Sequence, residues 1–271
     1  MSQTLCLTFS YLTTEQQQQL TAVLQYNYNL DGLEETNTEL LVYLPQEEFE
    51  NNNIKEITAH PFTQKIIPPQ NWNALWESNF EPVQVGNFCG IRAHFHPNFT
   101  NVTHEITITP KMSFGTGHHP TTYQVIQAMQ NLPFAGAAVA DFGTGSGILA
   151  ILAQKLGASN IVAVDNDEWC ITNTKENINN NNATNITVIQ AEMLPVGQYS
   201  IILANINKNI LLQHMAALYA NTAPNGYVVF SGILSEDEAD MKASINKNNY
   251  TIVTITNKNN WLCITVQKQS N

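Results

Sequence analysis

Two patterns of apolar and polar positions follow one another along the chain, and the change between them divides it into two parts. In the first part, short apolar runs alternate with a polar segment that Thr13 or Thr14 can cap as a helix. The predicted elements are strands at 5–11 and twice within 30–44, and helices at 13–26 and within 47–59. This β-α-β-β-α order predicts a small α+β domain of the split βαβ type.

From position 138 onwards, short apolar runs alternate with longer segments of helical period. The predicted strands lie at 138–142, 160–164, 186–189, 201–204 and 227–231, and the predicted helices near 147–156, 167–179, 208–221 and 235–248. Such alternation is typical of a mostly parallel sheet with helices on both faces. Two further runs, at 250–256 and 261–267, flank an Asn-rich turn and predict an antiparallel hairpin.

The region between these two patterns contains the expected domain boundary. Pro68 and Pro69 predict a break in the chain. Trp72, Trp76 and Phe80 follow at a spacing of four, as on one face of a helix. Two more strands are expected, at 90–94 and 105–109. We therefore predict a small domain at 1–64, a linker with an aromatic helix at 65–85, and an α/β domain at 86–271.

Composition excludes several classes of protein. Hydrophobic residues make up 43% of the chain, enough for a buried core, but no apolar run reaches the length of a membrane span. The four cysteines form no C-x-x-C pair and the start of the chain lacks a basic secretory segment, so we expect a cytoplasmic protein. A net charge of −11 gives no basic surface for nucleic acid and favours a basic protein partner.

The most informative motif is Asp141–Gly147, with the sequence D-F-G-T-G-S-G, between a predicted strand and a predicted helix. Glycines let the backbone turn sharply and approach a ligand, and a helix start presents free N–H groups. The next strand ends at Asp165, 22 positions after Gly143, where a carboxylate suits the two hydroxyls of a ribose. The motif therefore predicts a nucleoside pocket.

The spacing of the glycines indicates which class of nucleoside-containing ligand the pocket binds. A dinucleotide fingerprint needs a third glycine at position 148, where this chain has Ile, and no G-K-[ST] of a P-loop follows the turn. Asp141 would repel a pyrophosphate but suits a cation, such as the amino group of S-adenosylmethionine. We therefore predict S-adenosylmethionine as the cofactor, bound near Asp141, Gly143 and Gly145.

A second motif, Phe114–Thr122, has the sequence F-G-T-G-H-H-P-T-T and precedes the first strand of the sheet. Its glycines and hydroxyls predict a hydrogen-bonding loop, in which Thr121 or Thr122 caps a helix that runs to Leu132. Together with the glycine turn, Asp165 and the later A-N-I at 204–206, this loop resembles the bacterial ribosomal protein methyltransferases that act on large-subunit protein eleven.

The resemblance covers nearly all of the chain from about Trp72. It implies an α/β fold: a Rossmann-like methyltransferase sheet, mostly parallel with a terminal antiparallel hairpin, after a small α+β domain that recognises the substrate. It also implies that Asp165 holds the ribose hydroxyls and that Gly143 passes close to the methionine part of the cofactor. Thr122 would lie in a loop over the cofactor, and Asn205 would face both the sulfonium and the incoming amine.

Methyl transfer from a sulfonium is an in-line displacement, so positioning should supply most of the catalysis. The nucleophile must be a neutral amine, and removing the proton of a lysine at pH 7 costs about 4–5 kcal/mol. Asn205, whose side-chain oxygen can accept a hydrogen bond from the amine, is the predicted catalytic residue. The His118-His119 pair lacks a third ligand, so we expect no metal, and expect His119 to fix the loop by hydrogen bonds.

The expected function is methylation of lysine side chains, and also of an N-terminal amine, on a basic ribosomal protein by a monomeric enzyme. Methylation of a nucleic-acid base is disfavoured, because Asn205 is followed by Ile-Asn-Lys and not by the Pro-Pro-Tyr or Pro-Pro-Phe of adenine methyltransferases. Methylation of another protein or of a small molecule stays open. So does a non-catalytic adaptor that binds S-adenosylmethionine.

Overall fold

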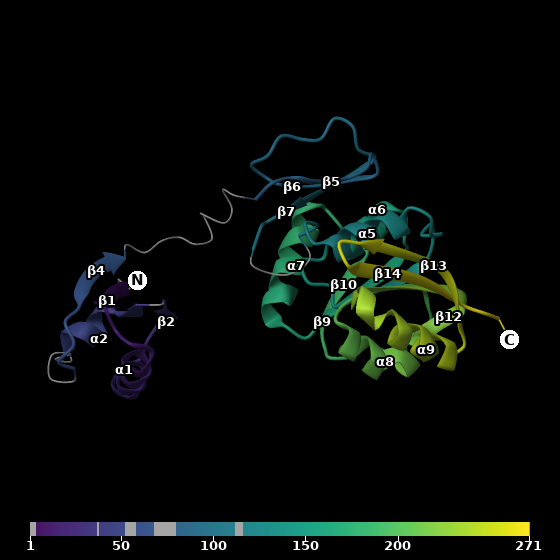
Figure 1. Ribbon diagram of the computed structural model, residues 1–271. Coiled ribbons are helices and arrows are strands. Elements are labelled where there is room, and N and C mark those ends of the chain that lie inside the picture. The colour runs from purple at the N-terminus through teal and green to yellow at the C-terminus, as the bar shows by residue number, and fades with distance from the viewer. Residues whose placement is uncertain (1–3, 37, 52–57, 68–79, 112–115, 271) are drawn as a thin grey trace. The chain divides into compact units, whose positions relative to one another are not determined.

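Figure 1 shows a computed structural model of the chain, in which residues 4–36, 38–51, 58–67, 80–111 and 116–270 are described. The chain divides into two compact units, residues 1–75 and 76–271. No helix within the described ranges is long and apolar enough to cross a lipid bilayer.

In its described residues, the first unit is a four-stranded antiparallel sheet with two helices, as the split βαβ pattern predicts. Its elements are β1 (Thr4–Ser10), α1 (Thr14–Asn27), β2 (Gly32–Glu35), β3 (Glu39–Pro45), α2 (Gln46–Asn51) and β4 (Thr63–Ile67), and the strand order is β2-β3-β1-β4. Thr13 caps α1 in a capping box: its hydroxyl accepts from Gln16 N, and Gln16 Oε1 accepts from Thr13 N. Alternate residues of β1 and β3 face α1 and form the core of this unit.

Strand β4 was not expected from the sequence. It pairs with β1 in antiparallel register, with Ile66 opposite Leu5, so the sheet includes residues 65–67, which the sequence pattern places in the linker. The two prolines that indicate a boundary come directly after this strand. The predicted aromatic helix with Trp72 and Trp76 lies outside the described residues.

The second unit is built on a seven-stranded sheet in the order β10-β9-β8-β11-β12-β14-β13. The strands are β8 (Ala138–Phe142), β9 (Asn160–Asp165), β10 (Ile186–Gln190), β11 (Tyr199–Asn205), β12 (Thr222–Leu234), β13 (Tyr250–Lys258) and β14 (Trp261–Lys268). The first five are parallel, and β14 runs antiparallel between β12 and β13. The predicted parallel sheet with a terminal hairpin is therefore confirmed.

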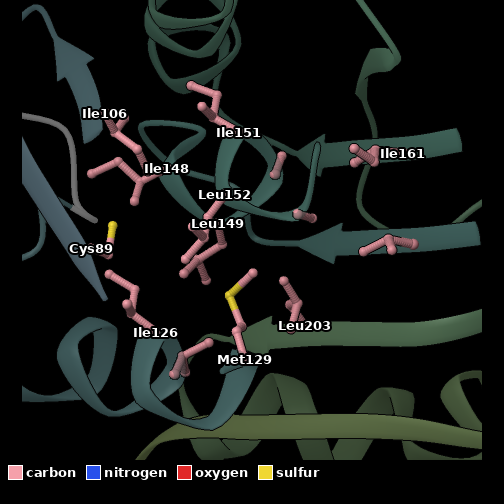
Figure 2. Packing of buried hydrophobic residues seen from close by; sticks show 14 of the residues in the cluster. Cys89, Ile106, Ile126, Met129, Ile148, Leu149, Ile151, Leu152, Ile161 and Leu203 are labelled. Carbon is pink, nitrogen blue, oxygen red and sulfur yellow. The ribbon is translucent and has the colours of Figure 1, made fainter. Parts of the chain in front are cut away.

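Helices cover both faces of this sheet (Figure 1). They are α5 (Pro120–Met129), α6 (Ile148–Lys155), α7 (Glu168–Asn180), α8 (Lys208–Asn221) and α9 (Glu238–Lys247), with a 3₁₀ turn at Ser235–Asp237. One apolar cluster joins α5 and α6 to one face, and a second joins α8 and α9 to the other. Figure 2 shows Leu149 and Leu152 of α6 near Met129 of α5 and Leu203 of the sheet, and Ile148 beside Ile106 and Cys89. Residues 148–153 of α6 are all buried, so the helix that starts at the glycine turn is fixed in place.

A separate three-stranded sheet, β5 (Val83–Val85), β6 (Cys89–Ala93) and β7 (His104–Ile108), packs on the first of these clusters. The sequence predicts β6 and β7 to within one residue at each end, but not β5. Phe80, from the predicted aromatic stripe, is buried in the same cluster. Phe80 and the three strands therefore belong to the core of the second unit.

Candidate active site

A cavity of about 460 Å³ opens at the carboxyl ends of the central parallel strands. Phe142 at the end of β8, Asp165 at the end of β9 and Asn205 at the end of β11 all line it. Because β8 lies between β9 and β11, the chain reverses its direction across the sheet at this point. Ligands of open α/β sheets bind at such switch points.

The glycine turn forms one wall of the cavity. Gly143 and Gly145 line it, and both have positive φ, +77° and +57°, which other residues rarely adopt. Gly143 N and Thr144 N both donate to the carbonyl oxygen of Val164, at 2.8 and 2.9 Å. A Cβ on Gly143 would lie 2.0 Å from Cγ2 of Ile206. The turn is therefore held between β9 and Ile206, with its backbone against the cavity.

Asp165 is held by two backbone amides. Its Oδ2 accepts from Gly145 N at 2.9 Å, and its Oδ1 accepts from Asp167 N at 3.1 Å. Each carboxylate oxygen keeps a second lone pair, so the fixed group can still accept from two hydroxyls. This is the geometry expected for a carboxylate that binds a ribose.

Asp141 lies behind the turn and is not on the cavity wall. Its Oδ2 accepts from Thr144 Oγ1 at 2.7 Å and from Ala150 N, in the first turn of α6, at 3.1 Å. The other oxygen, Oδ1, is buried and makes no hydrogen bond within the described residues. Complete burial raises the pKa of this carboxyl to about 7. The side chain points towards α6, so Asp141 supports the turn, and the predicted direct contact with the ligand does not follow from this geometry.

Asn205 and Thr122 form a pair at the end of β11. Asn205 Nδ2 donates to Thr122 Oγ1 at 3.2 Å, and both side chains are buried. Asn205 Oδ1 has no hydrogen-bond partner within the described residues, although Asn205 lines the cavity. Thr122 does not line the main cavity but a recess of about 10 Å³ that it shares with Gly143 and Asn205. The hydroxyl of Thr122 therefore fixes the amide of Asn205 from the side of this recess.

His119 begins the helix that carries Thr122. Its Nδ1 accepts from Thr121 N at 3.4 Å and from Thr121 Oγ1 at 2.8 Å, which makes His119 the N-cap of α5. The prediction that Thr121 or Thr122 caps this helix is therefore wrong, because Pro120 fits the first helical position. The helix also ends at Met129, before Leu132. The expected hydrogen bonding of His119 is confirmed, and partial burial lowers the pKa of its imidazole.

Several residues of the cavity were missed by sequence reasoning. Trp261, the first residue of β14, lines the cavity with its ring edge-on to His119, with ring centroids 4.8 Å apart. Ile206 and Ile210 add an apolar wall. Cys170 lies in the first turn of α7, and Glu192 lies in the loop after β10. The pairing of β9 with β10 could have indicated the last two, but no local motif marks Trp261.

The residues present fit S-adenosylmethionine. Gly143 and Gly145 line the cavity with backbone alone, Asp165 offers fixed acceptors, and Asn205 lines the same cavity and has an unpaired buried acceptor. With the seven-stranded sheet and its antiparallel β14, the fold and the site define a Rossmann-like methyltransferase that depends on S-adenosylmethionine.

Comparison with known proteins narrows this class to one family. The chain matches the family "Ribosomal protein L11 methyltransferase (PrmA)" over residues 6–269, and it belongs to that family. The L11 methyltransferase of Chlorobaculum parvum is 37% identical over 243 residues, which cover 82% of this chain and 84% of that protein. That of Porphyromonas gingivalis is 41% identical over 180 residues, 65% of this chain and 62% of that protein.

A solved structure supports the same assignment. The ribosomal protein L11 methylase from Lactobacillus delbrueckii subsp. bulgaricus matches with a TM-score of 0.65 and 27% identity, over 70% of this chain and 100% of that one. The resemblance stated from the sequence motifs, the fold class and the cofactor are therefore confirmed.

Proposed function

We propose that this protein transfers methyl groups to lysine side chains, and also to an N-terminal amine, of ribosomal protein L11. The names of its relatives suggest the substrate, and one structural observation suggests the chemistry. Asn205 lines the cavity, and its Oδ1 is a buried acceptor with no partner within the described residues. An unsatisfied buried acceptor costs about 1–3 kcal/mol, so the site favours a ligand that brings an N–H donor.

The amide of Asn205 is oriented for this role. Because its Nδ2 donates to Thr122 Oγ1, the amide is held in one orientation, and its buried oxygen keeps its acceptor positions for an amine that enters the cavity. A hydrogen bond to Oδ1 would direct one N–H of the amine and thereby its lone pair. Within this proposal Asn205 is the catalytic residue, and Thr122 is a positioning residue.

The remaining residues would hold the methyl donor. S-adenosylmethionine supplies, when bound, a methyl group on a sulfonium that can be displaced by a neutral amine. Asp165 would accept from the ribose hydroxyls, and Gly143 and Gly145 would let the backbone pass close to the methionine part. Asp141 would contribute through the turn, because its hydrogen bonds go to Thr144 and Ala150.

The first unit would recognise the protein substrate, as proposed for residues 1–64. Residues 1–75 contain nine Asp and Glu against two Lys and Arg, a net charge of −7 (2 − 9). Such a unit attracts a basic protein and disfavours nucleic acid. We also propose that the enzyme acts as a monomer in the cytoplasm.

The proposal is tested by incubating the protein with methyl-labelled S-adenosylmethionine and unmethylated L11, and locating the label by mass spectrometry. We expect label on lysines of L11, and its loss in Asn205→Ala while S-adenosylmethionine still binds. Asp165→Ala should instead lose cofactor affinity. Label on another protein or on RNA would refute the substrate, and cofactor binding without any transfer would favour the adaptor.

A further inference from the structure

Two large apolar side chains are exposed beside the cavity. Trp169, in the first turn of α7, is 79% exposed, and Met193, in the loop after β10, is 60% exposed. Each is next in sequence to a residue of the cavity wall, Cys170 for Trp169 and Glu192 for Met193. Neither side chain belongs to an apolar cluster formed by the described residues. Exposed apolar groups of this size at the edge of a site indicate an interaction surface.

The two segments that carry these side chains leave the sheet next to each other. Strands β9 and β10 are parallel, with Asp165 opposite Gln190 at their carboxyl ends. Beyond the ladder, Ala191 N donates to Asp165 O at 2.9 Å, and Gln190 Nε2 donates to Asn166 O at 3.1 Å. The loop before Trp169 and the loop before Met193 are therefore fixed to one another at the same edge of the cavity.

This edge is strongly acidic. Residues 165–169 and 190–196 include four carboxylates and no Lys or Arg. Asp165 and Asp167 bind backbone amides, but Glu168 and Glu192 are exposed and form no ion pair within the described residues. Unpaired carboxylates around an apolar centre are complementary to a surface that is basic and partly apolar.

We propose that Trp169, Met193, Glu168 and Glu192, here called the rim patch, form a docking surface for a basic face of the protein substrate. The inference rests on the proposed function, because its occupant is the protein that is methylated in the adjacent cavity. The indole face of Trp169 can receive the ammonium or guanidinium of a Lys or Arg, and Met193 can pack against the alkyl stem. Glu168 and Glu192 supply the charged margin.

Two other occupants are less compatible with the observations. The side chain of Trp169 is not part of the cavity wall, so it does not serve the cofactor directly. A second copy of the chain would bring the same carboxylates against one another across a two-fold axis, and like charges repel.

The test compares Trp169→Gln and Met193→Gln with the wild-type enzyme. Val253→Gln is the matched control, since Val253 is an exposed apolar residue, 49% exposed, on β13. We expect each rim variant to raise the KM for L11 about tenfold, as loss of an interface anchor does, with kcat and the Kd for S-adenosylmethionine unchanged. Glu168→Gln should raise KM less and weaken its dependence on salt. The control should match the wild type.

Each other outcome overturns the inference in a recognisable way. An unchanged KM in both rim variants, with L11 still methylated, rejects the rim patch alone. A weaker Kd for S-adenosylmethionine would assign Trp169 to the cofactor site, and a change of oligomeric state in ultracentrifugation would assign it to a contact between copies. If the wild-type enzyme does not methylate L11, the proposed function fails and the rim patch falls with it.

Discussion

Gln124 and Trp261 lie 137 positions apart, yet Gln124 Nε2 donates to the carbonyl oxygen of Trp261 at 2.9 Å. The same side chain accepts from Thr256 Oγ1 at 2.8 Å, and it is 2% exposed. Gln124 thereby joins α5 to both strands of the β13–β14 hairpin. Since His119 caps α5, this link sets where Trp261 meets His119 at the cavity wall.

Replacing Gln124 by Met keeps the volume but leaves the hydroxyl of Thr256 and the carbonyl of Trp261 without their partner. We expect the free energy of unfolding to fall by about 1 kcal/mol, since two part-buried hydrogen bonds are lost. Denaturant unfolding measures this. Gln127→Met, at an exposed position of the same helix, is the control and should change little. Equal stability of the two variants would mean that Gln124 does not fix the hairpin.

Gly143→Ala is expected to abolish tight binding of S-adenosylmethionine. The substitution adds strain at φ +77° and a clash with Ile206, which would displace the turn from the cavity. Gly136→Ala is a matched control, because Gly136 has φ +72° but, among the described residues beyond its chain neighbours, no atom within 4 Å of the added Cβ. It should lower stability by roughly 1–2 kcal/mol from backbone strain and leave cofactor affinity unchanged. Calorimetric titration measures the affinity of each variant for S-adenosylmethionine. Equal affinity of Gly143→Ala and Gly136→Ala would contradict the role of the turn in binding the cofactor.

Thr122→Val removes the hydroxyl that accepts from Asn205. We expect kcat to fall about tenfold, because the amide of Asn205 is then free to rotate, while the Kd for S-adenosylmethionine stays the same. Thr122→Ser keeps the hydroxyl and should restore most of the rate. A loss of cofactor affinity in Thr122→Val with kcat unchanged would show instead that Thr122 contacts the cofactor directly.

Asp141→Asn should change how stability depends on pH. Burial raises the pKa of Asp141 to about 7 in the folded chain, above its value in the unfolded chain. Between roughly pH 4 and pH 7 the folded state then binds more protons, so this carboxyl makes stability fall as pH rises. In the variant this carboxyl no longer titrates. The free energy of unfolding therefore loses a pH-dependent slope of up to about 1.4 kcal/mol per pH unit.

The measurement for Asp141 is the free energy of unfolding of both proteins from pH 4 to pH 8. We expect the stability of Asp141→Asn, relative to the wild type, to increase across this range. Parallel curves would show that Asp141 is ionised throughout, and that the buried carboxylate is stabilised by more than its bonds to Thr144 and Ala150.

The parts of the fold that could be predicted are those with a strong local pattern. β8 was predicted residue for residue, and Gly143, Asp165 and Asn205 meet in one cavity, because each lies at the end of a buried parallel strand. β4 was missed because its side chains are largely exposed and it forms an edge of the sheet, so no alternation marks it. The pairing that defines it depends on β1, about sixty residues earlier.

The features of the site that the sequence alone did not indicate have a similar cause. The sequence places Asp141 beside the turn but does not say to which side its carboxyl points, and packing against α6 decides this. Trp261 reaches the cavity only because β14 inserts between β12 and β13, which no short motif indicates. The N-cap at His119 could have been predicted, because Pro120 fits the first position of a helix and the residue before it is then the cap.

The place of β14 also determines the order in which the enzyme can assemble during synthesis. β13 is made before β14 but contacts the sheet only through it, so β13 cannot join the sheet until β14 has left the ribosome. A nascent chain that ends after β12 already contains the glycine turn, Asp165 and Asn205, but it lacks Trp261 and the hydrogen bond of Trp261 to Gln124. The wall of the cavity is therefore completed only after the glycine turn, Asp165 and Asn205 have all been translated.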